Sequence, residues 1–268
     1  MIAAMQFLEF AQFHLPGLEV DEVRFNIQIA LITAAMNDFP AGLQYWTLGK
    51  PGHCAIQHPG RAILLGALHR DECHRLARET EELHYPGVVG SEDTANWFVE
   101  QANSLGITFG KHIPQRIHVL TGSPQYPGAP GSPRAVAADD APLLFEWLRA
   151  FHQEAVPHDP PPKQENIGKA VSNGRYVFWV VGDEPVSVAA IARPLRTVVA
   201  LAPVYTPPEH RGRGYGGSVT ATLVDRAFAE GKTAVCLYTD LRNPASNRCY
   251  AKIGFRPYCD SSHYLRAC

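Results

Sequence analysis

A proline- and glycine-rich run, GSPQYPGAPGSP at residues 122–133, most limits how this chain can fold. Proline lacks a backbone N–H group and glycine adds flexible backbone angles, so neither a helix nor a sheet is expected to continue through the run. At roughly 100–200 residues per domain, a chain of 268 residues suggests two domains, each with its own core. We therefore predict an N-terminal α/β domain over 1–121, a linker over 122–133 and a C-terminal domain over 134–268.

The composition is that of a folded chain with nearly balanced charge. Its residues are 46% hydrophobic and 19% charged, and the formal net charge is -2. This balance argues against a nucleic-acid partner, because phosphate neutralisation needs a basic excess. No apolar stretch reaches the ~18 residues of a membrane span. The N-terminal apolar run contains Glu9 and has no basic region before it, unlike a secretory signal. We expect a cytoplasmic protein without a membrane partner.

The cysteines and histidines form no pattern typical of a disulfide framework or a metal site. His69, Cys73 and His74 fit one helix face, but no second ligand pair accompanies them at metal-site spacing. We predict no metal cofactor, and reduced thiols at all six cysteines, which show no CxxC pair: Cys54, Cys73, Cys236, Cys249, Cys259 and Cys268.

The first half of the chain shows helical and strand patterns but no catalytic motif. Helices are predicted around 20–38, 71–84 and 91–105, and strands at 44–48, 53–57, 61–66 and 116–120. In the second half, Asp139 and Asp140 are expected to cap a helix that has Pro142 in its first turn. A short helix to about 172 and strands at 176–181, 186–192 and 197–205 follow.

The most informative segment is a glycine-rich turn between the strand at 197–205 and a helix that ends near Gly231. Glycines let successive backbone N–H groups converge, and a helix start adds unpaired N–H groups and a positive dipole end. This combination binds phosphate. Gly212, Gly214 and Gly217 formally match the dinucleotide pattern GxGxxG. The match lies too far from the strand end, and no Gly-Lys-Ser/Thr follows to make a P-loop.

The order Arg211-x-x-Gly214-x-Gly216 instead resembles motif A of the GNAT acetyltransferase superfamily, where this turn binds the pyrophosphate of coenzyme A. A second segment is similar to the superfamily's motif B, with Asn243 opening a short helix, Tyr250 within it and Gly254-Phe255 closing it. The resemblance covers residues 134–268. It implies a central mixed, mostly antiparallel sheet flanked by helices, with the order strand, two helices, three strands, a helix, a strand, a helix and two terminal strands.

The resemblance also implies roles for individual residues. Backbone groups at positions matching Val204 and Thr206 are expected to bind the thioester carbonyl and the pantetheine arm; Thr206 departs from the usual aliphatic residue. The other positions expected to contact acetyl-CoA, as co-substrate, are Tyr205, Arg211, Gly212, Arg213, Gly214, Tyr215, Gly216, Asn243 and Ser246.

Tyr250 matches the residue that the family uses as general acid toward the departing thiolate. A phenol with a pKa near ~10 carries its proton at neutral pH. Tyr250 also lies on an apolar stripe of its helix, so simple packing is the alternative. Some members have a Glu base four residues before the position of Val204, where this chain has Ala200. The alternatives for the base are Glu154, His152, Glu209, Asp240 or a water chain.

Three hypotheses of function follow. The first is an N-acetyltransferase that moves an acetyl group to a primary amine of a small molecule or peptide. The second is a non-catalytic acyl-CoA-binding or regulatory module, and the third is a dinucleotide-binding enzyme. The N-terminal half is hypothesised to be a degenerate GNAT-like copy. Since it lacks the RxxGxG turn, we expect it to bind no coenzyme in the same manner, and to cover the acceptor site or form a homodimer contact.

Overall fold

The computed structural model describes residues 2–267, which divide into two compact units. Unit 1 contains the chain up to Ile117, together with Tyr238–Arg242 and the segment from Tyr258 onward. Unit 2 contains His118–Leu237 and Asn243–Pro257. The chain therefore passes from one unit to the other inside strands β5, β10 and β11, whose bounds are given below.

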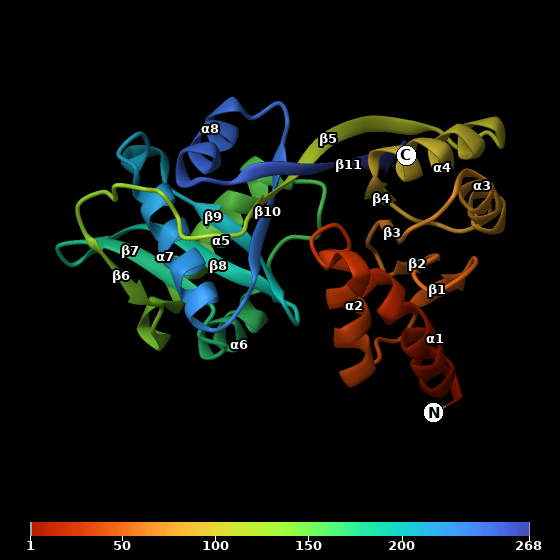
Figure 1. Ribbon diagram of the computed structural model, residues 1–268, viewed down its shortest axis with the longest axis horizontal. Coiled ribbons are helices and arrows are strands. Elements are labelled where there is room, and N and C mark those ends of the chain that lie inside the picture. The colour runs from red at the N-terminus through yellow and green to blue at the C-terminus, as the bar shows by residue number, and fades with distance from the viewer. Residues whose placement is uncertain (1, 268) are drawn as a thin grey trace. The chain divides into compact units, whose positions relative to one another are not determined.

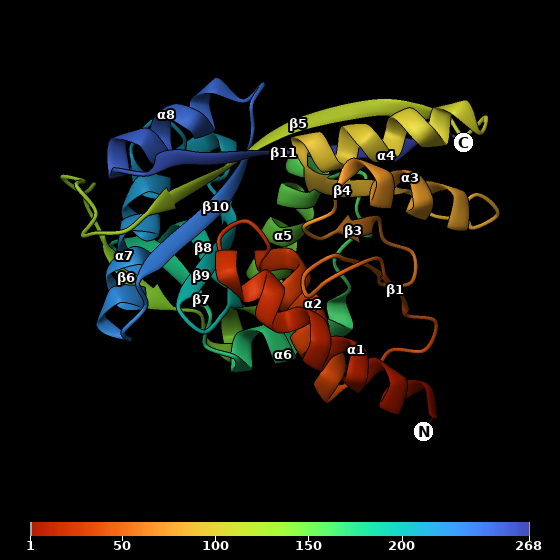
Figure 2. The same cartoon turned by 45° about the vertical axis from the view of Figure 1, so that its right-hand side comes forward.

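Unit 1 is a sheet covered by helices on both faces. Its elements are α1 (Ile2–Leu18), α2 (Asn26–Asn37), β1 (Gln44–Thr47), β2 (Cys54–Gln57), β3 (Ile63–Leu65), α3 (Arg70–Glu79), β4 (Gly87–Ser91), α4 (Glu92–Ser104) and β5 (Phe109–Leu120). Helices α3 and α4 lie side by side (Figure 2) and bury Leu76 and Phe98 against the sheet. Helix α1 packs on the other face through Phe7, whose ring lies 5.2 Å from that of Tyr45.

Unit 2 has the same layered construction (Figure 1). Its elements are β6 (Ser132–Ala135), α5 (Ala141–Ala155), α6 (Ile167–Ser172), β7 (Tyr176–Val181), β8 (Glu184–Pro194), β9 (Val198–Tyr205), α7 (Tyr215–Ala229), β10 (Ala234–Asp240) and α8 (Pro244–Ile253), followed by β11 (Arg256–Arg266). The strand order is β10-β9-β8-β7-β6, antiparallel except for the parallel pair β9–β10.

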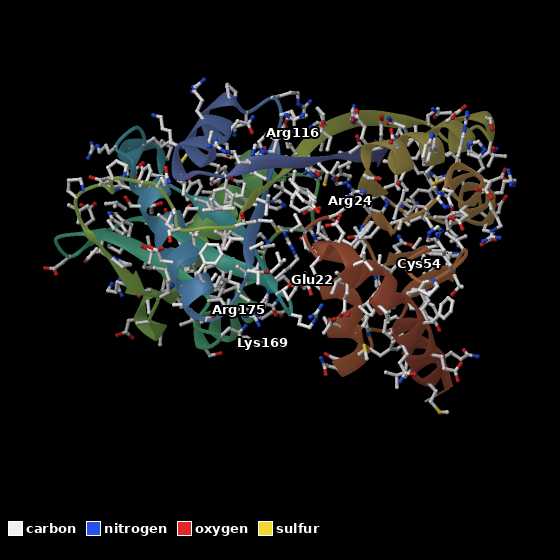
Figure 3. The ribbon with its side chains drawn as sticks, in the orientation of Figure 1. Glu22, Arg24, Cys54, Arg116, Lys169 and Arg175 are labelled. Carbon is white, nitrogen blue, oxygen red and sulfur yellow. The ribbon has the colours of Figure 1, made fainter. Side chains whose placement is uncertain are left out.

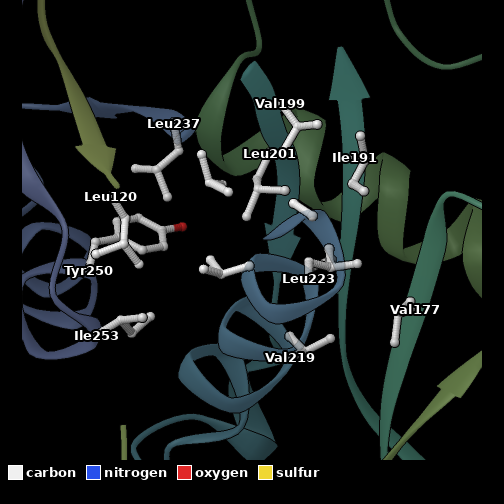
Figure 4. Packing of buried hydrophobic residues seen from close by; sticks show 14 of the residues in the cluster. Leu120, Val177, Ile191, Val199, Leu201, Val219, Leu223, Leu237, Tyr250 and Ile253 are labelled. Atoms are coloured by element: carbon white, nitrogen blue, oxygen red, sulfur yellow. The ribbon is translucent and has the colours of Figure 1, made fainter. Parts of the chain in front are cut away.

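Two apolar clusters hold unit 2 together, one on each face of its sheet. Val219 and Leu223 of α7 and Ile253 of α8 pack on one face (Figure 4). Leu144 and Trp147 of α5 pack with Phe178 on the other. Val199 and Leu201 of β9 both face the first cluster, as the two-residue period of a strand requires. Tyr205, four residues after Leu201, faces the second cluster because the pairing of β9 with β8 shifts between them.

After β6, which has no counterpart in unit 1, the element order of unit 1 recurs in unit 2. In each, two helices precede three antiparallel strands, a helix, a strand parallel to the third, a helix and a final strand. The parallel pairs occupy equivalent places: Ile63 pairs with Val88 in unit 1, and Val198 pairs with Ala234 in unit 2. A parallel pair needs a crossover connection, which α3 supplies in the first repeat and α7 in the second. The chain thus contains two copies of one mixed α/β arrangement.

The final strand β11 is shared between the units along its length. From Tyr258 onward it belongs to unit 1, where Ser261 to Leu265 pair antiparallel with β4. There a two-point ion pair links β5 to β11, with Arg116 (Figure 3) donating to Asp260 from Nε at 2.5 Å and from Nη2 at 2.8 Å. The last strand of the second repeat therefore completes the sheet of the first.

Several expectations from the sequence are corrected. The segment Ile2–Leu18 forms a helix that no pattern predicted, because its apolar residues occur all around it. The helix expected at 20–38 begins only at Asn26. The two expected terminal strands are one continuous strand. Strand β6 begins within the proline- and glycine-rich run, because Pro133 lies on an edge strand, where a missing N–H group is tolerated.

The described cysteines, at positions 54, 73, 236, 249 and 259, are free thiols, and Cys268 lies outside the described residues. Burial raises the pKa of the Cys54 and Cys73 thiols to about 12. Within residues 2–267, no group of three or more histidine, cysteine or carboxylate side chains is placed to hold a metal ion. No helix in this range is long and apolar enough to cross a membrane.

Candidate coenzyme-binding site

The glycine-rich turn follows β9 and leads into α7, as the sequence predicts. A short 3-10 turn, Pro208–His210, comes first, and then the chain reverses through two glycines. Gly212 has φ +78° and Gly214 has φ +85°, a left-handed conformation that residues with a Cβ rarely adopt. Gly214 is the N-cap of α7. Positive and negative φ values thus alternate from Gly212 to Gly214, the geometry of an anion-binding nest of backbone amides.

The backbone amides of this turn lack internal acceptors. The amides of His210 and Arg211 donate to Pro207 and Pro208, at 2.9 and 3.3 Å. From Gly212 to Gly217, in contrast, no N–H group of this described segment has a hydrogen-bond acceptor within the protein. Six consecutive free donors at the positive end of a 15-residue helix are suited to bind an anion such as a diphosphate.

Helix α7 approaches the end of β9 closely at Gly216. A Cβ atom built there would lie 3.1 Å from Oγ1 of Thr206 and 3.9 Å from Cγ1 of Val204. Ser187 of β8 fixes this end of the strand, since its hydroxyl donates to the Tyr205 carbonyl at 3.0 Å and lies 2.8 Å from the Thr206 hydroxyl. The turn and the end of the strand thus lie against each other and form one cradle.

Not every predicted position turns its side chain toward this cradle. The Tyr205 side chain packs on the α5 face, with its ring 6.4 Å from that of Trp147. Arg211 also points toward α5, where its Nη2 donates to both carboxylate oxygens of Glu154, while its Nε donates to the Thr206 carbonyl at 2.8 Å. Arg213 is exposed on the turn. The side chains of Tyr205 and Arg211 therefore do not face the cradle.

Strand β9 carries an irregularity just before the turn. Its pairing with β8 shifts between Ala189–Val204 and Ile191–Leu201, so that β9 has one more residue than β8 over this stretch. Its parallel pairing with β10 includes Cys236 and Ala200, and β9 continues from there to Tyr205. A bulge re-aims the backbone groups of the strand that carries it.

Tyr250 lies in the buried middle of α8. Its ring packs edge-on against Phe255, 5.9 Å away, and its hydroxyl points toward Leu237 and Leu201 (Figure 4). Burial raises the pKa of Tyr250 well above its usual range, against a smaller opposite effect of the hydrogen-bonding Ser246 hydroxyl. The phenol is therefore protonated at neutral pH.

Asn243 and Ser246 have structural partners. The Asn243 side chain accepts the Ser246 backbone N–H at 3.1 Å and caps α8, with Pro244 in the first turn and Gly254, at φ +111°, ending the helix. The predicted local features of this helix are all present. The cap that Asn243 forms on α8 is a sufficient structural role for this residue, and no ligand is needed to explain its presence.

The residues considered as general base are engaged elsewhere or exposed. Ala200 is fully buried within β9. Glu154 is paired with Arg211, and Asp240 with Arg242, which lowers the pKa of the Asp240 carboxyl through its guanidinium hydrogen bonds. The His152 ring lies 2.6 Å from the Asp159 carbonyl. Glu209 is exposed beside the turn.

Two residues near the cradle carried no signal in the sequence. Ser187 holds the end of β9, as described above. Tyr126, from the proline- and glycine-rich run, donates from its hydroxyl to the Gly214 carbonyl at 3.0 Å. The contact joins residues 88 positions apart, so no local spacing indicates it.

The equivalent turn of unit 1 is closed. Between β3 and α3, the amides of Gly66, Ala67 and Leu68 donate to backbone carbonyls. The next amide, of His69, donates to Oε2 of Glu72 at 2.8 Å, and Nδ1 of His53 lies 2.7 Å from the same oxygen. A carboxylate of the protein itself thus occupies the start of α3, where unit 2 leaves its amides free.

Residues 141–255 match the model of the acetyltransferase (GNAT) family, and this part of the chain is a GNAT domain. Solved structures resemble nearly the whole chain. A Drosophila protein with 14% identity gives a TM-score of 0.67, covering 93% of this chain and 94% of its own. For a GCN5-related N-acetyltransferase from Kribbella flavida, the identity is 17%, the TM-score 0.59 and the coverage 91% and 96%.

A tandem GNAT protein from the clavulanic acid biosynthesis pathway gives a TM-score of 0.57 at 12% identity, with 94% of each chain covered. At such identities the likeness establishes the fold. A two-domain GNAT arrangement fits the repeated element order of this chain. No curated protein sequence matches the chain.

Proposed function

We propose that unit 2 transfers the acetyl group of acetyl-CoA to a primary amine of a small molecule or peptide. The observation that carries this proposal is the run of free amides from Gly212 to Gly217 at the end of β9, in a domain of the GNAT family. Acetyl-CoA supplies the thioester whose carbonyl carbon the amine attacks directly.

The turn binds the diphosphate of the coenzyme through its backbone. The amides of Gly212 to Gly216 donate to the phosphate oxygens, and the positive end of α7 favours the negative charge. The exposed Arg213 adds a cation beside them. The Arg211 side chain, held by Glu154, instead fixes the entry to the turn.

The irregular end of β9 positions the reacting group. Backbone groups of Val204 and Thr206 hold the thioester carbonyl and the pantetheine arm, and a donor aimed at developing oxyanion charge contributes ~3 kcal/mol to transition-state stabilisation. Tyr250 donates its phenolic proton to the departing thiolate. Asn243 and Ser246, at the start of the helix that carries Tyr250, contact the pantetheine arm.

A second candidate function is a non-catalytic acyl-CoA-binding module. Its support is specific: Ala200 stands where some family members have a Glu as general base, and Glu154, Asp240 and His152 all have partners within the protein. Turnover then requires the exposed Glu209 or a water chain to take the proton of the attacking amine. A dinucleotide site is less well supported, because the third glycine of GxGxxG, Gly217, packs against Tyr126.

Calorimetric titration with acetyl-CoA and with NAD tests these proposals. Binding of acetyl-CoA without NAD is the expected result, and binding of NAD alone would refute both coenzyme A proposals. Thiol release from acetyl-CoA, measured over a panel of small amines and peptides, then separates the two. Thiol release that depends on an amine establishes the enzyme, whereas tight binding without release under any amine favours the binding module.

A further inference from the structure

The segment 121–131 is a strap bound to unit 2. Figure 1 shows it as the yellow-green trace between β5 and β6, crossing over α7. Four hydrogen bonds hold it: Gln125 N–H to the Ile253 carbonyl at 2.8 Å, Tyr126 Oη to the Gly214 carbonyl at 3.0 Å, Ala129 N–H to Ser218 Oγ at 2.7 Å, and Trp179 Nε1 to the Pro130 carbonyl at 2.9 Å. Two of the four end on the first turn of α7 or its N-cap.

Tyr126 packs directly on two glycines of the coenzyme turn. A Cβ atom at Gly214 would lie 2.8 Å from the Tyr126 hydroxyl, and one at Gly217 would lie 2.4 Å from Cζ of its ring. Gly214 also needs its positive φ, but Gly217 has ordinary helical geometry. Nothing in the backbone therefore requires glycine at 217. The Tyr126 ring occupies the space that a Cβ atom at position 217 would need, and this explains the glycine.

The hydroxyl of Tyr126 acts on the peptide group that enters the anion cradle. The Gly214 carbonyl accepts two hydrogen bonds, from Tyr126 and from the Ser218 N–H at 3.0 Å. In a trans peptide the N–H of the next residue points the opposite way, so both bonds direct the Tyr215 N–H out of the helix end. A carbonyl that accepts two bonds also polarises its peptide and strengthens the N–H as a donor.

We propose that Tyr126 is a positioning residue for the coenzyme diphosphate, holding the Gly214–Tyr215 peptide so that the Tyr215 and Gly216 amides face the phosphate oxygens. This inference rests on the proposed function of unit 2. The phenol is suited to the task because burial raises its pKa above the usual range, and the hydroxyl keeps its proton at neutral pH. The strap thus couples the segment between the two repeats to coenzyme affinity.

The test is Tyr126→Phe, which keeps the ring and removes only the donor. Backbone-amide NMR titrations follow three ligands: acetyl-CoA, inorganic diphosphate and acetylpantetheine, which carries no phosphate. We expect the dissociation constants for acetyl-CoA and for diphosphate to rise by the same factor, about fivefold for one neutral hydrogen bond. The constant for acetylpantetheine stays at its wild-type value. Tyr264→Phe, which removes a hydroxyl bonded to Asn96 in unit 1, is the matched control and changes none of the three.

Unchanged diphosphate binding in Tyr126→Phe, or an equal loss for acetylpantetheine, would overturn the role of Tyr126 while leaving the proposed function intact. A wild-type protein that binds no acetyl-CoA would overturn both.

A double-mutant cycle gives an independent check. Gly217→Ala should weaken acetyl-CoA binding in the wild-type background and have no effect beside Tyr126→Ala, where the clashing ring is gone. Equal effects in both backgrounds would show that Gly217 is not paired with Tyr126.

Discussion

Arg211 and Glu154 form a two-point ion pair in which one guanidinium nitrogen donates to both carboxylate oxygens, at 3.0 and 2.7 Å. The guanidinium carbon also lies 5.7 Å from the centre of the Tyr205 ring. The arginine that begins the RxxGxG pattern therefore points toward α5, where a carboxylate neutralises its positive charge. The proposed coenzyme site therefore offers backbone amides to an anion rather than the first arginine of the pattern.

Replacing this arginine should consequently matter less than replacing a glycine of the turn. We expect Arg211→Ala to raise the dissociation constant of acetyl-CoA by less than about threefold, because a half-exposed ion pair contributes ~1 kcal/mol or less. Gly214→Ala should raise it by more than about tenfold, because a Cβ at φ +85° is strained and meets the Tyr126 hydroxyl. Calorimetry on both variants checks the ranking, and a larger loss in Arg211→Ala would contradict it.

The Tyr250 hydroxyl should affect turnover rather than binding. We expect Tyr250→Phe to lower kcat by ~100-fold or more, the usual contribution of a general acid, with the dissociation constant of acetyl-CoA near the wild-type value. Because burial raises the pKa of Tyr250, loss of its proton should cause no decline in kcat up to pH 10. A pH–rate profile and calorimetry measure the two effects. Unchanged turnover would identify Tyr250 as a packing residue.

The local features of the site could be predicted from the sequence, because they depend on neighbouring residues. A strand, glycines with left-handed angles and an amphipathic helix identify the turn. An Asn-Pro start and a Gly end identify α8. What could not be predicted depends on distant contacts. Nothing near Tyr126 indicates that it contacts Gly214, and nothing near Arg211 indicates Glu154, 57 positions away.

The helices and strands of the fold could be predicted to a similar extent. Periodicity identified α3 and α4 in unit 1, where polar and apolar faces differ, but failed for α1, whose apolar residues occur all around the helix. Two expected terminal strands became a single β11 because Ser261 to Leu265 find a partner in β4 of the first repeat. Pairing across such a sequence distance follows from the whole topology and not from local residue preferences.

Asn243 offers a way to separate helix capping from ligand binding. Asn243→Ala should reduce the free energy of unfolding by about 1 kcal/mol, because the Ser246 N–H loses its acceptor. Asn243→Ser retains a capping oxygen and should be near wild type in denaturant unfolding. If capping is its whole role, both variants bind acetyl-CoA with wild-type affinity. A serine variant that is stable but binds acetyl-CoA poorly would instead establish contact with the coenzyme.

The buried His14 should make unit 1 sensitive to acid. Burial, assisted by the nearby His53, lowers the pKa of His14 to about 4, while its Nε2 lies 3.0 Å from the Thr47 hydroxyl. An unfolded chain binds this proton near pH 6.5, so the folded state loses stability as pH falls from there toward 4. Between pH 7 and 5 the wild type should lose about 2 kcal/mol more unfolding free energy than His14→Gln. Denaturant unfolding at both pH values measures the difference, and parallel losses would contradict the assignment.

The contrast between the two turns predicts a single coenzyme site in the chain. In unit 1 the amides from Gly66 to His69 are all bonded, and the Glu72 carboxylate at the start of α3 repels a second anion. Calorimetry with acetyl-CoA should therefore give one site per chain, and Gly214→Ala should weaken that site without revealing another. Glu72→Gln keeps an acceptor at the same place and should also bind one equivalent. A stoichiometry of two, or a full-affinity site that survives in Gly214→Ala, would mean that the first repeat opens its turn in solution.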